Sequence, residues 1–177
     1  RLGCEATGFR PLGEAAAIPA TEDDGWRGRV RGSVHDEKAH LLGGVAGHAG
    51  LFGTACDLGR LADAYLGPLC RSRGPGLPSA LVREAVAVQA DDPVLCRGLG
   101  WALKTSDEGS SGALLSRASF GHTGFTGTSL WCDPSRDLAI VLLTNAVYYG
   151  RRDLRELRAA VGDAVVREFG ERCAQSA

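Results

Sequence analysis

The chain has 177 residues, of which 44% are hydrophobic and 23% are charged, enough for one packed domain but not comfortably for two. Twenty Lys and Arg side chains against 21 Asp and Glu leave a formal net charge of −1, so no overall field draws the protein to nucleic acid or to an anionic membrane. No apolar stretch approaches the ~20 residues that a membrane-spanning helix needs. We therefore expect no nucleic-acid partner and no membrane span in this chain.

The chain opens on Arg1 and contains no Met, which predicts that it is a piece of a longer protein. Any targeting segment would then lie outside the sequence, so the residues indicate no compartment. The six cysteines are scattered without a Cys-x-x-Cys pair, which argues against zinc-ribbon and thioredoxin-like proteins. We expect them to be reduced and to serve the packing.

The first part of the chain, 1–53, combines many glycines and other turn formers with little periodicity. This texture predicts an irregular segment on the surface. The first helix is predicted over 55–66, where apolar residues recur at helical spacing behind a capping pattern that begins at Thr54. Gly67 and Pro68 are expected to end it.

A second helix is predicted to open after Pro78 and to close at the turn 91–93, so the stretch 54–90 holds two helices. The texture then changes to strand over 98–145. Antiparallel strands are expected at 99–103, 119–123, 126–132 and 138–144. The run 138–143 is apolar at every position, which predicts a central strand covered by helices on both faces.

A C-terminal helix is predicted over 152–170, with Asp153 and Glu156 as its capping pair and Gly170 as a left-handed stop. It should pack on the sheet. The order of a loop, two helices, three or four antiparallel strands and a helix predicts an α+β fold in which an antiparallel sheet lies between helices.

All four histidines lie in two glycine-rich segments, 35–50 and 121–128. Tightly packed turns would explain both segments equally well. Neither segment has the glycine pattern of a nucleotide-binding loop. A metal site is chemically possible but lacks the i, i+4 histidine spacing of a helical zinc motif, so no metal is predicted. Its ligands would be His35, Asp36, His40 and His48.

The second glycine-rich segment predicts a strand that carries His122, Thr123 and Gly124. A glycine at an open strand edge lets an extended substrate pair with the backbone, a Thr hydroxyl binds a carboxylate or carbonyl, and a His moves a proton. A histidine that merely caps a turn is the alternative, and the residues alone do not separate the two.

Four stretches resemble the serine β-lactamases and penicillin-binding-protein-like hydrolases, closest to the class C β-lactamase-related esterases and D,D-peptidases. These stretches are 32–37, 42–58, 120–133 and 142–145. The resemblance runs from about Gly32 to Asn145. It implies an incomplete β-lactamase/transpeptidase-like fold, with 1–177 as the C-terminal part of a single domain.

Members of that family carry a Ser-x-x-Lys helix, a Tyr-x-Asn loop and a Lys-Thr-Gly strand. Only the strand is present here, as His122-Thr123-Gly124 with His in place of Lys. Lys38 and Lys104 are the only lysines and neither follows a Ser by three positions, while no Tyr is followed two positions later by Asn. The nucleophile is therefore expected upstream, outside this chain.

The resemblance also assigns roles to individual residues. The N–H of Phe125 would be one oxyanion-hole donor, Thr123 would contact a substrate carboxylate or carbonyl, and Gly124 would keep the strand edge open. The implied catalytic set is His122, Thr123, Gly124 and Phe125. The implied substrate-binding set is His35, Asp36, Gly47 and His48, for which loop packing is an equally good explanation of the histidines and the aspartate.

The expected function is that of part of a serine hydrolase that acts on ester or amide substrates, either β-lactams or cell-wall peptides, through an acyl-enzyme. Replacement of Lys by His favours esters or cell-wall peptides over β-lactams, because a mostly neutral imidazole attracts a carboxylate less than an ammonium does. No cofactor is implied, and the partner is a small molecule or a peptide. A catalytically inactive binding protein for peptidoglycan peptides is the alternative.

Overall fold

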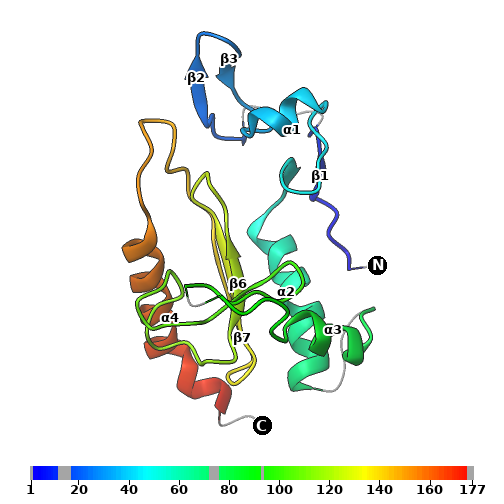
Figure 1. Ribbon diagram of the computed structural model, residues 1–177, viewed down its shortest axis with the longest axis vertical. Helices are drawn as coiled ribbons and strands as arrows, with labels where there is room; N and C mark the ends of the chain where they lie inside the picture. The colour runs from blue at the N-terminus through cyan, green and yellow to red at the C-terminus, as the bar shows by residue number, and fades with distance from the viewer. Residues whose placement is uncertain (1, 12–16, 72–75, 93, 175–177) are drawn as a thin grey trace.

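The computed structural model describes residues 2–11, 17–71, 76–92 and 94–174, and the side chains up to residue 170. Its centre is a four-stranded antiparallel sheet in the order β5-β6-β7-β8. The strands are β5 (Ala102–Leu103), β6 (Phe120–Thr123), β7 (Ser129–Asp133) and β8 (Leu138–Leu142). The sheet lies between helix α2 (Ala55–Cys70) and helix α4 (Arg155–Ala174) (Figure 1). The expected α+β architecture is thus confirmed.

Successive side chains of each strand point to opposite faces of the sheet, so the core has two layers, one on each face. On the α2 face, buried residues come from the helix and from three strands, namely Ala62, Leu66, Leu103, Phe120, Leu130 and Cys132. On the α4 face, Trp131 packs with Val166 of the helix. β7 is buried at every position, so it is the strand on which both layers rest.

Helix α2 does not end where the sequence predicted. Thr54 caps its N-terminus by accepting from the Asp57 N–H at 3.2 Å, as expected. However, Pro68 lies inside the helix, which continues to Cys70 and closes with the Arg71 N–H donating to Gly67 at 3.0 Å. Proline costs a helix one backbone hydrogen bond, and here the buried last turn packs on the sheet and offsets that loss.

The end of α4 was also predicted wrongly. Gly170 keeps helical backbone and is buried, and the helix runs on to Ala174. A Cβ built on Gly170 would lie 3.3 Å from the Arg136 side chain, in the β7–β8 turn. The glycine therefore lets the helix approach that turn closely, and its role is packing rather than a stop.

All four predicted strands and one predicted helix are shorter in the structure, most clearly the strands predicted at 99–103 and 126–132. Residues 98–101 form a turn in which the Gly98 N–H donates to Trp101 at 2.9 Å, so β5 starts only at Ala102. Thr126 and its neighbours belong to the turn before β7. Helix α3 (Ser79–Ala85) ends early because the Ala85 carbonyl accepts from the Leu99 N–H at 2.8 Å.

Strand β8 is covered by helices on both faces, as its apolar sequence indicates, since both α2 and α4 contact it. It is not central, however: in the described residues it pairs only with β7, and all five of its positions are half-buried. The chain after β8 leaves the sheet, and the Ala146 N–H donates to Thr126 at 2.8 Å. The prediction of a central strand was therefore wrong for this chain.

The N-terminal region is more regular than its composition suggested. It contains β1 (Gly8–Phe9) paired with β4 (Leu51–Phe52), a hairpin of β2 (Glu22–Asp24) and β3 (Gly28–Val30), and helix α1 (Glu37–Leu41). Asp24 builds the hairpin turn by accepting from the N–H groups of Trp26 and Arg27. These elements extend beyond the end of the sheet at which the β6–β7 turn lies (Figure 1). None of the described helices is both long and apolar enough to cross a membrane.

Candidate functional site

The β6–β7 turn holds the residues that the sequence singled out. β6 ends at Thr123, and the Gly124 N–H then donates to the Thr128 carbonyl at 2.8 Å. The Gly127 N–H closes the turn on the Gly124 carbonyl at 3.1 Å, with Gly127 at φ +117°, a value that L side chains rarely adopt. The turn is short and closed by backbone hydrogen bonds, so its residues are held in place.

The outer edge of β6 is open beside this turn. β5 starts at Ala102, opposite Gly121, so the two residues of β6 that follow Gly121 extend beyond their partner strand. The N–H of Lys104, directly after β5, donates to the Ser119 carbonyl. Alternate residues of a strand turn their backbone N–H and C=O groups to the same edge. The backbone of Thr123 therefore faces the open edge, as that of Ser119 faces β5. An extended chain could pair with that edge.

His122 is exposed and makes two polar contacts. Its Nδ1 lies 2.9 Å from the Thr123 carbonyl, and its Nε2 lies 3.1 Å from Nη1 of Arg97. A guanidinium can only donate and a carbonyl can only accept, so both contacts are satisfied by a neutral imidazole with its proton on Nδ1. The cation at this point of the site is Arg97.

Phe125 joins the two glycine-rich segments. The residue is 62% exposed, and its ring lies 5.5 Å from the ring of His35. His35 in turn contacts the Thr21 hydroxyl at 3.0 Å through Nδ1. The guanidinium of Arg151 lies over the Phe125 ring, 5.1 Å from the ring centroid. The structure thus places His35 beside the turn, and it makes the Phe125 ring an apolar surface next to the open edge.

The other residues of the predicted binding set hold their own loop. Asp36 caps α1 by accepting from the Ala39 N–H at 2.8 Å, and it also contacts His48 Nε2 at 3.0 Å. These contacts, the backbone one first, lower the pKa of the Asp36 carboxyl. Gly47 is exposed, with no atom near its missing side chain. No hydrogen bond among the described residues joins this group to the β6–β7 turn, so the geometry favours loop packing for it.

An arginine of helix α4 stabilises the β6–β7 turn. Arg158 donates from Nη2 to the carbonyls of Gly124 and Thr128, at 3.0 and 3.2 Å. Thr144 donates to the Gly127 carbonyl at 2.7 Å, and Asn145 donates to the Ala20 carbonyl at 2.6 Å. The chain after β8 therefore ties the turn to the N-terminal region.

Three arginines around the turn were missed at the level of sequence, namely Arg97, Arg151 and Arg158. They lie 25 or more residues from the His-Thr-Gly motif along the chain, and an arginine in a loop or at a helix start carries no pattern of its own. Thr144 and Asn145, by contrast, lie in a stretch that carries the family resemblance. Only the fold could show which arginines reach the site.

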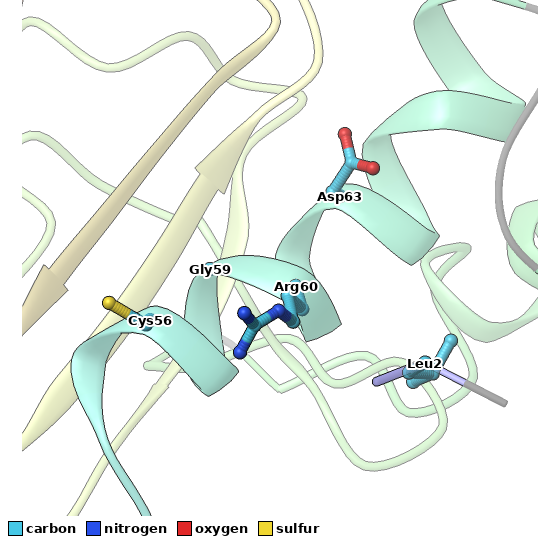
Figure 2. Close-up of a pocket in the computed structure, with 5 residues that line it drawn as sticks. All are labelled: Leu2, Cys56, Gly59, Arg60 and Asp63. Carbon is cyan, nitrogen blue, oxygen red and sulfur yellow. The ribbon is translucent and has the colours of Figure 1, made fainter. Parts of the chain in front are cut away.

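A separate depression of about 520 Å³ lies between the N-terminal segment and α2 (Figure 2). It is lined by Leu2, Cys56, Gly59, Arg60 and Asp63, none of which belongs to the predicted site. Within the described part of the chain, no group of three His, Cys, Asp or Glu side chains is arranged to hold a metal ion. Of the four residues that could have been ligands, Asp36 and His48 contact each other, His35 contacts Thr21, and His40 lies beside Ser33 and Trp26.

Comparison with solved structures supports the fold. A β-lactamase from Mycobacterium bovis aligns over 69% of this chain and 46% of its own, at 28% identity and a TM-score of 0.56. EstCE1, a hydrolase with promiscuous acyltransferase activity, aligns over 93% of this chain and 47% of its own with a TM-score of 0.63. At 18% identity, the second likeness shows the fold alone.

Sequence comparison extends the resemblance at both ends. Putative D-alanyl-D-alanine carboxypeptidases of Salmonella typhi and Salmonella paratyphi B are each 32% identical over 162 residues, which cover 81% of this chain and 37% of the relative. The chain thus spans little more than a third of these curated relatives. The model of the beta-lactamase family matches residues 1–163, which reaches beyond the stretch from Gly32 to Asn145. The chain belongs to the β-lactamase family.

Proposed function

We propose that this chain is part of a serine hydrolase that cleaves ester or amide bonds through an acyl-enzyme, and that it contributes the strand edge against which the substrate lies. The observation that carries the proposal is the open edge of β6 with its His122-Thr123-Gly124 motif, in a chain of the β-lactamase family. The carboxypeptidase relatives support a peptide substrate, and an ester is the other candidate.

The proposed roles are those that the family resemblance implies, and the places of the residues in the turn support them. Thr123 lies at the end of the open edge, where its backbone pairs with an extended substrate and its hydroxyl contacts a carbonyl or carboxylate. Gly124 keeps the approach free of a side chain. The N–H of Phe125 is one donor to the oxyanion that forms during acyl transfer, a contribution that typically amounts to ~10²–10³ in rate. The nucleophilic serine lies upstream of this chain.

The test labels the intact gene product with a fluorophosphonate or a fluorescent penicillin and locates the modified residue by mass spectrometry. We expect a modified serine outside residues 1–177, followed by Lys three positions later. Residues 1–177 alone should show no turnover of a chromogenic ester, because loss of the nucleophile costs about 10⁶ in rate in related chemistry.

Two results would decide against this function. Turnover by residues 1–177 alone, or a label on one of their own serines, would show that the nucleophile was placed wrongly. An intact protein that binds peptidoglycan peptides but takes up no label would instead be the inactive binding protein. A Thr123→Val variant, which keeps the shape of the side chain but loses the hydroxyl, should lower kcat/KM in the active case.

A further inference from the structure

We propose that the ring of Phe125 binds an aromatic group of the substrate next to the scissile carbonyl, and that His35 holds the ring in place for this contact. The inference rests on the proposed function, because it concerns the same turn. It deepens that function by naming a substrate class, esters or amides that carry a flat apolar group. The contact belongs to the side chain of Phe125, whereas the proposed oxyanion contact belongs to its backbone N–H.

The Phe125 ring offers apolar surface to a ligand. Phe120, five residues earlier, is fully buried in the core, whereas Phe125 is 62% exposed. An aromatic side chain covers roughly 150–250 Å² when it is fully buried, so a large part of this surface is still in contact with water. Covering it with an apolar group of the substrate is favourable, because apolar surface then leaves water.

The ring lies where a substituent of the reacting carbonyl would come. β6 ends at Thr123 with an open edge, and Phe125 follows two residues later in the closed β6–β7 turn. With the carbonyl oxygen on the Phe125 N–H, a group one or two bonds from that carbonyl is within reach of the side chain of the same residue. A single exposed hydrophobic residue is ordinary elsewhere on a protein surface, but this one borders the proposed reaction site.

Two neighbours fix the orientation of the Phe125 ring. The His35 ring lies 5.5 Å from it, with the two planes 31° apart, and the Arg151 guanidinium lies 5.1 Å from its centroid. Aromatic pairs are favourable at centroid distances of roughly 4.5–7 Å, and a cation within about 6 Å of a ring is attracted to it. A substrate ring adds a further contact of the aromatic kind, which favours an aromatic group over an aliphatic one of equal size.

His35 is itself held by its surroundings. Its Nδ1 lies 3.0 Å from the Thr21 hydroxyl, and the Thr21 N–H donates to the Val30 carbonyl at 2.9 Å, at the end of β3. His35 is half-buried, and its neighbour Val34 is buried. The histidine is therefore attached to the β2–β3 hairpin and gives Phe125 a fixed surface to lie against.

The chain after β8 joins the two sides of this aromatic pair. Asn145 donates to the Ala20 carbonyl at 2.6 Å, and the next residue, Ala146, donates its N–H to the Thr126 carbonyl at 2.8 Å. One short segment thus ties the loop against which the histidine rests to the turn that carries the phenylalanine. Little ordering is needed when a ligand binds to a surface that is fixed in this way.

The kinetic test uses the intact gene product and three esters, namely ethyl acetate, ethyl phenylacetate and benzyl acetate. The second carries an aromatic group in the acyl part and the third in the leaving group, and a pH indicator follows the acid released. The measured quantity is the ratio of kcat/KM for each aromatic ester to that for ethyl acetate. Phe125→Ala should lower at least one ratio roughly tenfold, because an apolar contact that discriminates between substrates is lost. The ratio that falls identifies the side of the carbonyl on which the aromatic group lies.

Conservative variants separate binding by the ring from mere support of the turn. Phe125→Tyr should keep the ratios, and Phe125→Leu, which keeps an apolar side chain in the turn, should lower the affected ratio by a smaller factor than Phe125→Ala. His35→Ala should lower the same ratio, and His35→Phe, which restores a ring, should recover it. A ratio that is unchanged in both His35 variants would overturn the role of the histidine.

The matched control is Leu81→Ala, which removes a hydrophobic side chain that is 59% exposed. Leu81 belongs to helix α3, at the opposite end of the sheet from the β6–β7 turn (Figure 1). This variant should leave both ratios unchanged. Two unchanged ratios in Phe125→Ala would overturn the proposal, and so would an equal loss for all three esters in both Phe125→Ala and Phe125→Leu.

A binding measurement separates this inference from the proposed function. The backbone amide signals of Gly124, Phe125 and Thr126 are followed by NMR in the intact gene product while N-methylphenylacetamide or N-methylacetamide is added. We expect the aromatic amide to shift them at a concentration at least about tenfold lower, in the parent protein and in Leu81→Ala but not in Phe125→Ala. If no ester is hydrolysed, the proposed function fails while this pattern still supports the Phe125 ring. Equal shifts by the two amides in the parent protein overturn its role.

Discussion

Gly124 marks the point where β6 leaves the sheet, and its surroundings explain why no side chain is found there. Its N–H is bonded to the Thr128 carbonyl, and a Cβ built on it would collide with the Thr128 hydroxyl. Arg158 holds the carbonyl of the same residue. The backbone of Gly124 is thus fixed on both sides, and the missing side chain is required by space.

We therefore predict that Gly124→Ala destabilises the protein by about 1 to 3 kcal/mol, as overpacking at a tight position does. Ester hydrolysis by the intact gene product should fall as the turn shifts. Chemical denaturation and initial rates measure the two effects. The double variant Gly124→Ala with Thr128→Ala should recover much of the stability, because the colliding hydroxyl is gone.

Gly47→Ala is the matched control, since nothing lies near its missing side chain. It should change the free energy of unfolding by no more than about 0.5 kcal/mol. A Gly124→Ala protein as stable as this control would contradict the space argument.

The residues of the site differ in how far the sequence reveals them. The His-Thr-Gly motif is contiguous, so its pattern is visible in three consecutive residues. The residues that support and complete it, Arg97, Arg151 and Arg158, reach it only through the fold of a loop and a helix. The predicted substrate-binding residues Asp36 and His48 contact each other, and no hydrogen bond among the described residues joins them to the motif.

At the scale of elements, the N-terminal segment is attached to helix α2 through one carboxylate. Asp57 is only 2% exposed and accepts from the Thr7 hydroxyl at 2.8 Å, the Ala6 N–H at 2.9 Å and Arg60 at 2.6 Å. The Thr7 hydrogen bond, with those of Arg60 and Ala6, lowers the pKa of the carboxyl below its ordinary value of 3.8. The negatively charged carboxylate of Asp57 is therefore the form that holds the N-terminal segment on helix α2.

The sign of the pH dependence follows from this direction. A carboxyl with a lowered pKa in the folded state contributes stability above its unfolded value, and that stability is lost as the pH falls through the folded value. We expect the melting temperature of the protein to fall below about pH 4, and Asp57→Asn to show a smaller fall over the same range. Thermal unfolding followed by circular dichroism between pH 7 and pH 3 measures both.

Asp63→Asn is a suitable control, because Asp63 lies on the same helix with an exposed carboxylate. Its acid dependence should match that of the parent protein. An Asp57→Asn variant with the parent's full acid loss would place the responsible carboxyl elsewhere.

Local signals placed the elements but not their ends. The apolar spacing indicated α2 and α4, yet Pro68 and Gly170 lie inside these helices. Proline and glycine each cost a helix stability, and burial against the sheet offsets that cost here. The β2–β3 hairpin was hidden because its strands are only three residues long. The position of β8 at the sheet edge depends on pairing between strands, which apolar periodicity does not encode.

At the scale of the molecule, the sheet and its two helices form one core, and Cys132 lies in the middle of it. The residue is fully buried in β7, and burial first, then the neighbouring Cys70, raises the pKa of its thiol to about 12. Cys70, at the end of α2, has a pKa raised to about 11, again mainly by burial. Cys56, in contrast, is exposed.

We predict that iodoacetamide at pH 8 modifies Cys56 of the native protein and leaves Cys132 unmodified, because only thiolates react and the Cys132 thiol is both protonated and covered. Mass spectrometry of tryptic peptides measures the extent at each position. In denaturant, Cys132 should become reactive together with the loss of Trp fluorescence, since Trp101 belongs to the same layer of the core. Modification of Cys132 well below the unfolding transition would show that the two layers separate locally, and the sheet would then not be the rigid support on which the open edge of β6 depends.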